Sequence, residues 1–443
     1  MGTVGESGRG AAGAKSAFDA HHAPARELMD KCVHCGFCLP VCPTYVLWHE
    51  EMDSPRGRIY LMRLAADGAA EMNQKWVGHF DACLGCMACM TACPSGVDYG
   101  KLIEATRAQI ERNHPRSAAE RAYRRMIFST FTVPSRLRAL LLPLKAYQKT
   151  GAQTLARKMG LLKLLPKKLR SMESLLPRLE KGEAVAEVTP AKGAQRHRVG
   201  MLTGCVQSVF FPQVNAATAR VLAAEGCEVV APREQACCGA LLLHAGEEEE
   251  AQAMARRTID AFERAKVETV IVNAAGCGSS MKEYGHLLRD DPQYAARARE
   301  FSAKCRDVSE FLAGLEPRAA RNPLGLRVAY HDSCHLQHAQ GIRSQPRALL
   351  SRIPQIEIVE IPEAAVCCGS AGIYNLVQPD AATELGDRKA ANVAGLKPDV
   401  VVSGNPGCLL QLRTALGRAG KDVRVLHTIE LLDASIRGET IGR

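Results

Sequence analysis

The sequence is poor in aromatic residues and has no long apolar run. Phe, Trp and Tyr make up 5% of its 443 residues, with two tryptophans, so its cores are expected to consist mainly of aliphatic side chains and alanine. No stretch approaches the roughly 18 apolar residues that a transmembrane helix needs, which excludes such a helix. Residues 1–15 are rich in Gly, Ala and Ser without an apolar segment, so we expect no secretory signal and a cytoplasmic location.

Motifs for several common kinds of chemistry are also missing. No G-x-G-x-x-G follows a predicted strand, and the chain has no P-loop, which argues against a flavin, nicotinamide or nucleoside triphosphate site. There is no G-x-S-x-G either, which argues against a serine nucleophile of that kind. The sequence therefore offers no place for a hydride acceptor and no catalytic residue.

The net charge of +10 is concentrated in one segment. Residues 121–178 contain fourteen Lys or Arg and a single acidic residue, Glu173. Prolines at positions 115, 134, 143, 166 and 177 divide residues 114–195 into short helices, which we expect to be amphipathic. Leucines among the basic residues are typical of a helix that lies on an anionic membrane surface. An acidic partner subunit fits nearly as well, whereas nucleic acid is disfavoured because no reader motif accompanies the charge.

Eighteen cysteines are the most informative feature of the chain. In a long chain without an export signal, metal ligation is favoured over disulfides. Residues 32–43 and 83–94 each read C-x-x-C-x-x-C-x-x-x-C-P, in which three cysteines converge on one [4Fe–4S] cluster and the fourth ligates the other cluster. The predicted ligands are Cys32, Cys35, Cys38 and Cys93 for the first cluster, and Cys83, Cys86, Cys89 and Cys42 for the second. Zinc is the alternative, but zinc sites use two cysteine pairs rather than three evenly spaced cysteines.

Two neighbouring clusters would form a one-electron relay. Arg56 and Arg58 lie between the motifs, where they could stabilise reduced clusters or simply form a solvated helix face. Ser54 as N-cap and Pro55 as the first helical residue predict a helix start, and a second helix is expected over 99–112. We therefore expect a mostly helical ferredoxin-like module over residues 25–113, preceded by a disordered tail, residues 1–24.

From residue 196 onward the pattern β-α-β-α-β occurs twice, which predicts two α/β domains with parallel sheets, residues 196–322 and 323–443. Their cysteines repeat at offsets of 129 to 131 residues, so the second domain duplicates the first. The repeated sets are Cys205, Cys237, Cys238 and Cys277, then Cys334, Cys367, Cys368 and Cys408. Each set could bind a further iron–sulfur cluster or consist of buried free thiols. The fold class is thus α+β multidomain.

A few residues remain outside these sets. Cys227 and Cys305 are expected to be ordinary core or surface residues. Around Cys334 stand three histidines, His331, His335 and His338, for which contact with a metal or a quinone and a hydrogen-bonded structural role both remain open.

The sequence resembles the iron–sulfur subunits of respiratory flavin-linked dehydrogenases, and most closely those of glycolate oxidase (glycolate dehydrogenase). The resemblance runs from about Asp30 to the C-terminus and includes Cys-Val-His-Cys-Gly-Phe-Cys from Cys32, Ser-Pro-Arg-Gly-Arg-Ile-Tyr-Leu from Ser54 and Cys-Cys-Gly-Ser-Ala-Gly from Cys367. It implies a complex with two FAD-type subunits, in which glycolate is oxidised to glyoxylate on a partner's FAD. Electrons would then pass through two [4Fe–4S] clusters toward quinone, at the cytoplasmic face of the inner membrane.

Alternatives within this resemblance are the iron–sulfur subunit of a D-lactate or glycerol-3-phosphate dehydrogenase, and a heterodisulfide-reductase-like catalytic subunit. Relatives in that wider Cys-Cys-Gly group end each domain with C-x-x-C. Here Ser280 and Gln411 stand at the last position. The departure weakens the case for further clusters and argues against disulfide reduction.

Overall fold

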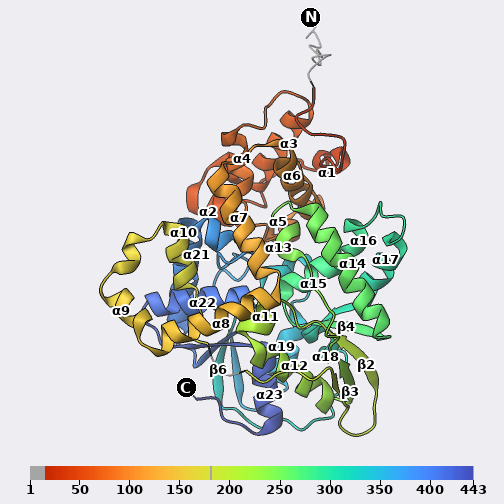
Figure 1. Ribbon diagram of the computed structural model, residues 1–443, viewed down its shortest axis with the longest axis vertical. Coiled ribbons are helices and arrows are strands. Elements are labelled where there is room, and N and C mark those ends of the chain that lie inside the picture. Colours follow the sequence, from red (N-terminus) through yellow and green to blue (C-terminus); the bar gives the residue numbers. More distant parts are fainter. Residues whose placement is uncertain (1–14, 180–181, 443) are drawn as a thin grey trace, which may run out of the picture.

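A computed structural model describes residues 15–179 and 182–442, and Figure 1 shows a helical N-terminal module at one end of two α/β domains that lie side by side. The module consists of α1 (Arg26–Asp30), α2 (Pro43–Trp48), η1 (Glu51–Asp53), α3 (Pro55–Ala66), α4 (Gln74–Asp81), α5 (Ala88–Ala92) and α6 (Tyr99–Asn113). The predicted start of α3 is confirmed, because Ser54 Oγ accepts a hydrogen bond from Gly57 N at 3.0 Å and Pro55 is the first helical residue. The apolar core of the module includes Met62, Phe80 and Leu102.

The prediction of a disordered tail is wrong for residues 15–24, while residues 1–14 lie outside the described residues. Phe18 is buried against Trp76, with ring centroids 6.0 Å apart. Asp19 pairs with Arg112 at 3.1 Å. His22 lies 2.6 Å from Glu248, so this segment also contacts the first α/β domain. One aromatic and two polar anchors therefore order a stretch whose overall composition is typical of a tail.

The basic segment forms α7 (Ala118–Phe131), α8 (Pro134–Lys149), α9 (Ala152–Lys158), η2 (Leu161–Leu164) and α10 (Lys167–Ser174). Its division into short helices is confirmed except at Pro143, which lies inside α8. Packing of α8 against α7, α9 and α11 (Val206–Phe210) holds the helix together despite the hydrogen bond that a proline cannot donate. In the described part of the chain, no helix has both the length and the apolar character required to span a bilayer.

The predicted duplication is confirmed by the two sheets. The first has the strand order β1-β3-β2-β4-β5 and the second β7-β6-β8-β9, and all pairings are parallel except that of β1 with β3. The strands are β1 (Val188–Thr189), β2 (His197–Met201), β3 (Cys227–Val230), β4 (Thr269–Val272), β5 (Cys305–Asp307), β6 (Leu326–Tyr330), β7 (Ile356–Glu360), β8 (Val400–Ser403) and β9 (Arg424–His427). Because β1 belongs to the first sheet, that sheet recruits residues expected in the linker. Cys227 and Cys305 lie buried in strands, as core residues.

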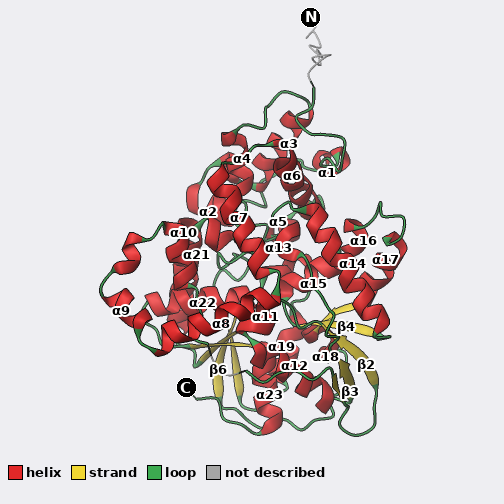
Figure 2. Ribbon diagram, in the orientation of Figure 1, coloured by secondary structure: helices red, strands yellow, loops and turns green. Residues whose placement is uncertain are grey.

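Helices cover both sheets (Figure 2). In the first domain they are α11, α12 (Pro212–Ala224), α13 (Ala240–Leu243), α14 (Glu248–Arg264), α15 (Ala275–Lys282), α16 (Tyr284–Leu287), α17 (Ala295–Lys304) and α18 (Val308–Ala313). In the second they are the π-helical turn η3 (His335–Ala339), α19 (Ser344–Ser351), α20 (Tyr374–Val377), α21 (Pro379–Leu396), α22 (Pro406–Arg418) and α23 (Thr428–Arg437).

The two α/β domains share one apolar core and are joined by specific polar contacts. Helix α12 packs against α23, and Arg220 pairs there with the buried Asp433 at 2.6 Å. His427 Nε2 donates to the carbonyl oxygen of Asn273 at 2.9 Å, and the backbone N–H of Ala275 donates to Gly404 O at 3.1 Å. These bonds join the carboxyl-end loops of one sheet to those of the other, and thereby fix the cysteine-bearing loops relative to one another.

Candidate iron–sulfur and cysteine sites

The two Cys-x-x-Cys-x-x-Cys loops of the N-terminal module have the same backbone conformation. In each loop the residue before the second cysteine and the residue after it have positive φ angles, 56° and 90° at His34 and Gly36, 63° and 62° at Gly85 and Met87. Such left-handed residues are uncommon outside glycine and bend the chain sharply. The residues between the cysteines differ in the two loops, yet both loops form the same turn. The spacing of the cysteines is therefore what the two turns have in common.

The first predicted ligand set lies around one cavity. Its walls include the sulfur-bearing residues Cys32, Cys35, Cys38 and Cys93. Cys93 reaches this cavity from the second motif, as the sharing of the fourth ligand requires. Arg56 lies at the same place and donates from Nη1 to the carbonyl oxygen of His34 at 2.9 Å. Burial raises the pKa of Cys38 to about 11, so this set is suited to thiolates that a metal ion, rather than water, stabilises.

The second set, Cys42, Cys83, Cys86 and Cys89, is buried. Burial and then the neighbouring thiols of Cys86, Cys83 and Cys42 raise the pKa of Cys89 well above its ordinary value. These side chains are thus close enough to interact electrostatically, and Cys42 comes from the first motif as predicted. Several buried thiols with raised pKa values fit a metal cluster, because the cluster's iron offsets the negative charge that burial disfavours.

Arg58 is fully buried beside the second set, so the interpretation of this residue as part of a solvated helix face is wrong. Its guanidinium donates to the carbonyl oxygen of His79 at 2.6 Å and to Thr44 Oγ1 at 3.1 Å. Burial alone would raise the pKa of Cys83, but the positive charges of Arg58 and Arg107 lower it below its ordinary value. The sequence offered no sign of this burial, since the contacts of Arg58 come from three different segments.

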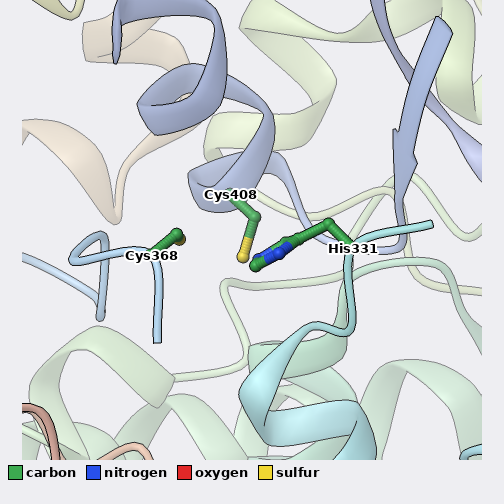
Figure 3. A group of neighbouring side chains, drawn as sticks. All are labelled: His331, Cys368 and Cys408. Carbon is green, nitrogen blue, oxygen red and sulfur yellow. The ribbon is translucent and has the colours of Figure 1, made fainter. Parts of the chain in front are cut away.

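In the second α/β domain the four predicted cysteines come together with a histidine. Figure 3 shows His331, Cys368 and Cys408 side by side, with their ligand atoms within 4.8 Å of one another. Hydrogen bonding with Cys334 and then Cys368 lowers the pKa of Cys367, and Cys368 lowers that of Cys408 together with His331. Two members of this set thus favour the thiolate form. His331 follows β6, and Cys408 lies in the first turn of α22 after β8, at the carboxyl edge where open α/β sheets bind ligands.

Gly369 positions the Cys367-Cys368 loop. Its φ of 89° is left-handed, and a Cβ at this position would lie 2.7 Å from the carbonyl oxygen of Ala382 in α21. Gly239 stands at the equivalent place after Cys238, with a φ of 80° and Ala251 O at 3.2 Å from such a Cβ. In both domains the glycine therefore lets the cysteine pair approach the following helix closely.

The cysteines of the first α/β domain also converge, in a different electrostatic setting. Cys237 and Cys205 have their sulfur atoms 3.4 Å apart, and Cys238 hydrogen-bonds with Cys277. Hydrogen bonding with Cys237 and burial raise the pKa of Cys205 well above its ordinary value. Leu202 occupies the position that corresponds to His331, so this set has no histidine partner there. The first set is thus the one that favours neutral thiols.

The cysteine set of the second α/β domain lies against the predicted ligands of the second cluster in the N-terminal module. Cys86 and Cys367 belong to one buried apolar cluster with Cys334 and Tyr374. They also influence each other's charge, since the Cys367 thiolate contributes, after burial, to the raised pKa of Cys86. The sequence could not have placed these two cysteines together, because 281 residues separate them and only the packing of the two domains makes the contact.

Ser280 and Gln411, which stand where the wider Cys-Cys-Gly group has the last cysteine of C-x-x-C, are both buried inside the protein. Gln411 is buried and donates from Nε2 to Ala382 O at 2.6 Å, and its Oε1 accepts from Asn375. Neither side chain reproduces a thiol ligand, in agreement with the departure from the wider Cys-Cys-Gly pattern.

The three histidines around Cys334 have different roles. His338 is structural, with Nδ1 2.9 Å from Thr91 Oγ1 and Nε2 3.3 Å from the carbonyl oxygen of Ala365. His331 joins the second cysteine set. His335 places Nδ1 3.5 Å from Cys334 Sγ and its ring 4.8 Å from that of His244. Sequence reasoning missed His244 and Tyr374, because nothing in their local sequence indicates that they lie near a cysteine site.

Known protein families match nearly all of these parts. Residues 28–97 match the 4Fe-4S dicluster domain, and residues 199–282 and 328–413 match the Cysteine-rich domain. Residues 119–176, within the basic segment, match the linker region of the glycolate oxidase iron-sulfur subunit.

Similar proteins extend over most of the chain. It is 41% identical to the probable glycolate oxidase iron-sulfur subunit of Bacillus subtilis over 92% of this chain and 95% of that protein. It is 36% identical to the glycolate oxidase iron-sulfur subunit of Escherichia coli, over 94% of this chain and 96% of that protein. It is also 30% identical to one of the subunits of the fumarate reductase (CoM/CoB) of Methanothermobacter marburgensis, over 91% of this chain and 71% of that protein.

Proposed function

This chain belongs to the family of glycolate oxidase iron–sulfur subunits, and from that membership we propose that it relays electrons from a flavin-bearing partner toward a quinone in a glycolate-oxidising complex. The observation that carries the proposal is the pair of equally folded cysteine loops in the N-terminal module. The [4Fe–4S] clusters that these loops bind supply one-electron transfer. The polypeptide's own task is to hold, insulate and electrostatically adjust them.

The ligand assignment is part of the proposal. Cys32, Cys35, Cys38 and Cys93 would hold one cluster, because these four residues line one cavity, whose wall also includes Cys89 of the other set. Cys83, Cys86, Cys89 and Cys42 would hold the other, and their burial and mutual electrostatic influence support this set. The exchange of the fourth cysteine between the motifs keeps the two clusters close together, which suits a relay.

A further iron–sulfur group belongs, in this proposal, to the second α/β domain. Cys334, Cys367, Cys368 and Cys408 converge there beside His331, and two of these thiols have lowered pKa values. The corresponding set of the first domain has Leu202 at the position of His331, so it has no histidine beside it and would remain free. Iron content distinguishes the two: Cys408→Ala should lower the iron bound per chain, whereas Cys277→Ala should leave it unchanged.

The partners follow from the family resemblance. It implies that the FAD that oxidises glycolate to glyoxylate would be held by other dehydrogenase subunits, two in number, and this sequence contains no nucleotide-binding motif of its own. The acceptor would be quinone, and the basic segment would place the complex on an anionic membrane surface at the cytoplasmic side. Exposed apolar side chains within that segment, such as Leu142 and Leu164, support such a contact.

Co-purification of the chain with its flavin-bearing partners tests this function. The complex should reduce ferricyanide with glycolate and much more slowly with D-lactate or glycerol 3-phosphate, and it should lose ubiquinone-1 reduction when Cys86→Ala removes a relay ligand. Equal or faster reduction with D-lactate would instead make the chain a subunit of a lactate dehydrogenase. Activity in the isolated chain would favour a self-contained catalytic subunit.

A further inference from the structure

A cavity of about 250 Å³ lies where the N-terminal module, the basic segment and both α/β domains meet. Cys83 of the second predicted ligand set forms part of its wall, and α7 and α10 contribute Arg124 and Lys168. Arg124 of α7 donates from Nη2 to the carbonyl oxygen of Ala245, just after α13, at 2.9 Å. His244 follows α13 and Tyr374 begins α20, so each domain supplies a side chain to this space.

Four polar atoms of residues in this wall have no hydrogen-bond partner in the described parts of the chain, 15–179 and 182–442. They are Arg124 Nε, His244 Nε2, His335 Nε2 and Tyr374 Oη. His335 and Tyr374 are only 8% and 4% exposed, so bulk water does not satisfy them. Buried polar groups are nearly always hydrogen-bonded, and four that are not, around one cavity, indicate a ligand with complementary polar atoms.

The character of the wall restricts which ligand fits. Arg107 donates from Nη1 and Nη2 to the carbonyl oxygens of His244, Phe80 and Cys83, which hold its guanidinium against the backbone. Arg124 donates from Nη2 to Glu111 and to Ala245 O, which leaves its buried Nε as a donor toward an uncharged acceptor. Between the polar atoms the wall is apolar, with Leu84, Leu241, Ile373 and Val377. An uncharged flat ring with polar oxygens suits this surface better than a small anion does.

We infer that this cavity binds the headgroup of a quinone and is where the quinone is reduced. The inference rests on the proposed function, since it names the place at which that electron relay ends. The carbonyl oxygens of the quinone would take hydrogen bonds from Tyr374 and the two histidines, and its ring would lie against the apolar wall. Because Cys83 borders the same space, the acceptor would stand next to a ligand of the relay.

The reduction balances with what the proposed activity supplies. Oxidation of glycolate to glyoxylate releases two electrons and two protons, and the quinone takes up two electrons and two protons to become the quinol. The electrons arrive one at a time through the relay, and the protons come from water. His244 connects this wall to a carboxylate, with Nδ1 2.9 Å from Oε1 of the half-buried Glu104, and this pair would conduct the protons inward.

The route for the quinone tail also fits. Lys168, in the wall, belongs to α10, which directly follows Leu164 and Leu165. Leu164 is 83% exposed although it is a large apolar side chain. A membrane-bound quinone could thus enter beside the segment that is proposed to contact the membrane.

The experiment uses the purified complex of this chain with its flavin-bearing partners and ubiquinone-1 as the probe. Leu241→Trp narrows the cavity, and Tyr374→Phe removes one hydroxyl while keeping the ring. Tyr60→Phe, at an exposed position of α3, is the matched control. Glycolate-dependent reduction of ubiquinone-1 and of ferricyanide is measured for each complex, together with binding of ubiquinone-1 by calorimetry.

We expect Leu241→Trp to weaken ubiquinone-1 binding and its reduction at least tenfold, and Tyr374→Phe to raise the KM for ubiquinone-1 severalfold. Ferricyanide reduction should stay within twofold in both, and Tyr60→Phe should match wild type throughout. Unchanged ubiquinone-1 binding and reduction in both cavity variants would overturn the inference. If wild type reduces neither acceptor with glycolate, the proposed function itself fails, and if glycolate rather than ubiquinone-1 loses binding in Leu241→Trp, the cavity is a carboxylate site.

Discussion

The guanidinium of Arg58 has no exposed surface, and its Nη2 donates a hydrogen bond to Oδ1 of Asp53 at 3.2 Å. The same Asp53 oxygen lies 3.0 Å from His79 Nδ1. A buried cation next to Cys83 and Cys42 costs folding free energy unless nearby negative charges compensate it. In the proposed ligand assignment it would offset the negative charge of the thiolates, and it would do so more strongly than a solvated arginine could.

Replacement of this cation should change a reduction potential. Arg58→Gln removes a positive charge that favours the reduced, more negative state, so the potential of the cluster nearest Cys83 should fall by on the order of 50 to 100 mV. Arg56→Gln is the matched control: its side chain is 26% exposed and lies at the first cysteine loop, so solvent screens it and the shift should be smaller. Redox titration followed by EPR measures both, and equal shifts in the two variants would contradict this role for burial.

The Cys367-Cys368 loop should depend on the absence of a side chain at Gly369. Gly369→Ala adds left-handed strain of about 1–2 kcal/mol and a Cβ only 2.7 Å from Ala382 O, so the loop must move. Gly341→Ala carries similar strain, with a φ of 69°, but no atom within 4 Å of its Cβ. Thermal unfolding of the anaerobically purified protein should therefore show the larger loss for Gly369→Ala. Similar losses in the two variants would mean that the close approach is unimportant.

The interface between the α/β domains should weaken in acid because of His427. Burial lowers the pKa of this histidine from 6.5 to about 4. The unfolded chain binds the proton first as the pH falls, so the stabilisation is fully present above about pH 6.5 and is lost progressively down to about pH 4. Between pH 7 and pH 5 this amounts to about 2 kcal/mol of the free energy of unfolding.

His427→Gln should remove that part of the pH dependence, and the exposed His49→Gln should not. Urea titrations at pH 7 and pH 5 give the two free energies for each variant. If wild type and His427→Gln lose the same free energy between these pH values, His427 does not carry the effect.

Membrane contact through the basic segment should depend on charge. Binding to vesicles that contain phosphatidylserine should fall steeply as salt rises. Lys163→Glu, next to the exposed Leu164, should weaken binding about tenfold, because each basic residue contributes about 1 kcal/mol and the acid adds repulsion. Lys304→Glu, which makes the same change on the exposed end of α17, should have little effect. Equal binding to uncharged vesicles in high salt would contradict a charge-driven contact.

Much of this architecture could be predicted from the sequence, because it depends on residues that are close together along the chain. The start of α3 required only Ser54 and Pro55, and the alternation from residue 196 predicted parallel sheets. The short β5 and β9 were missed, since three or four residues with charges among them carry little periodic signal.

What the sequence could not supply depends on contacts between distant segments. The break predicted at Pro143 is absent because neighbouring helices hold α8, and residues 15–24 are ordered by Trp76 and Arg112. The burial of Arg58, the approach of Cys86 to Cys367 and the pairing of His244 with His335 likewise arise only when the module docks on both α/β domains. Motif spacing predicted the ligands, but the surroundings that would adjust their chemistry belong to the tertiary structure.

Iron and acid-labile sulfide analysis of the anaerobically purified chain, with EPR after dithionite reduction, tests the central claim most directly. The eight cysteines of the N-terminal module predict at least about eight iron and eight sulfide per chain, and the EPR signals of two interacting reduced [4Fe–4S] clusters. A colourless, EPR-silent protein with zinc bound by Cys32, Cys35, Cys83 and Cys86 would contradict the account.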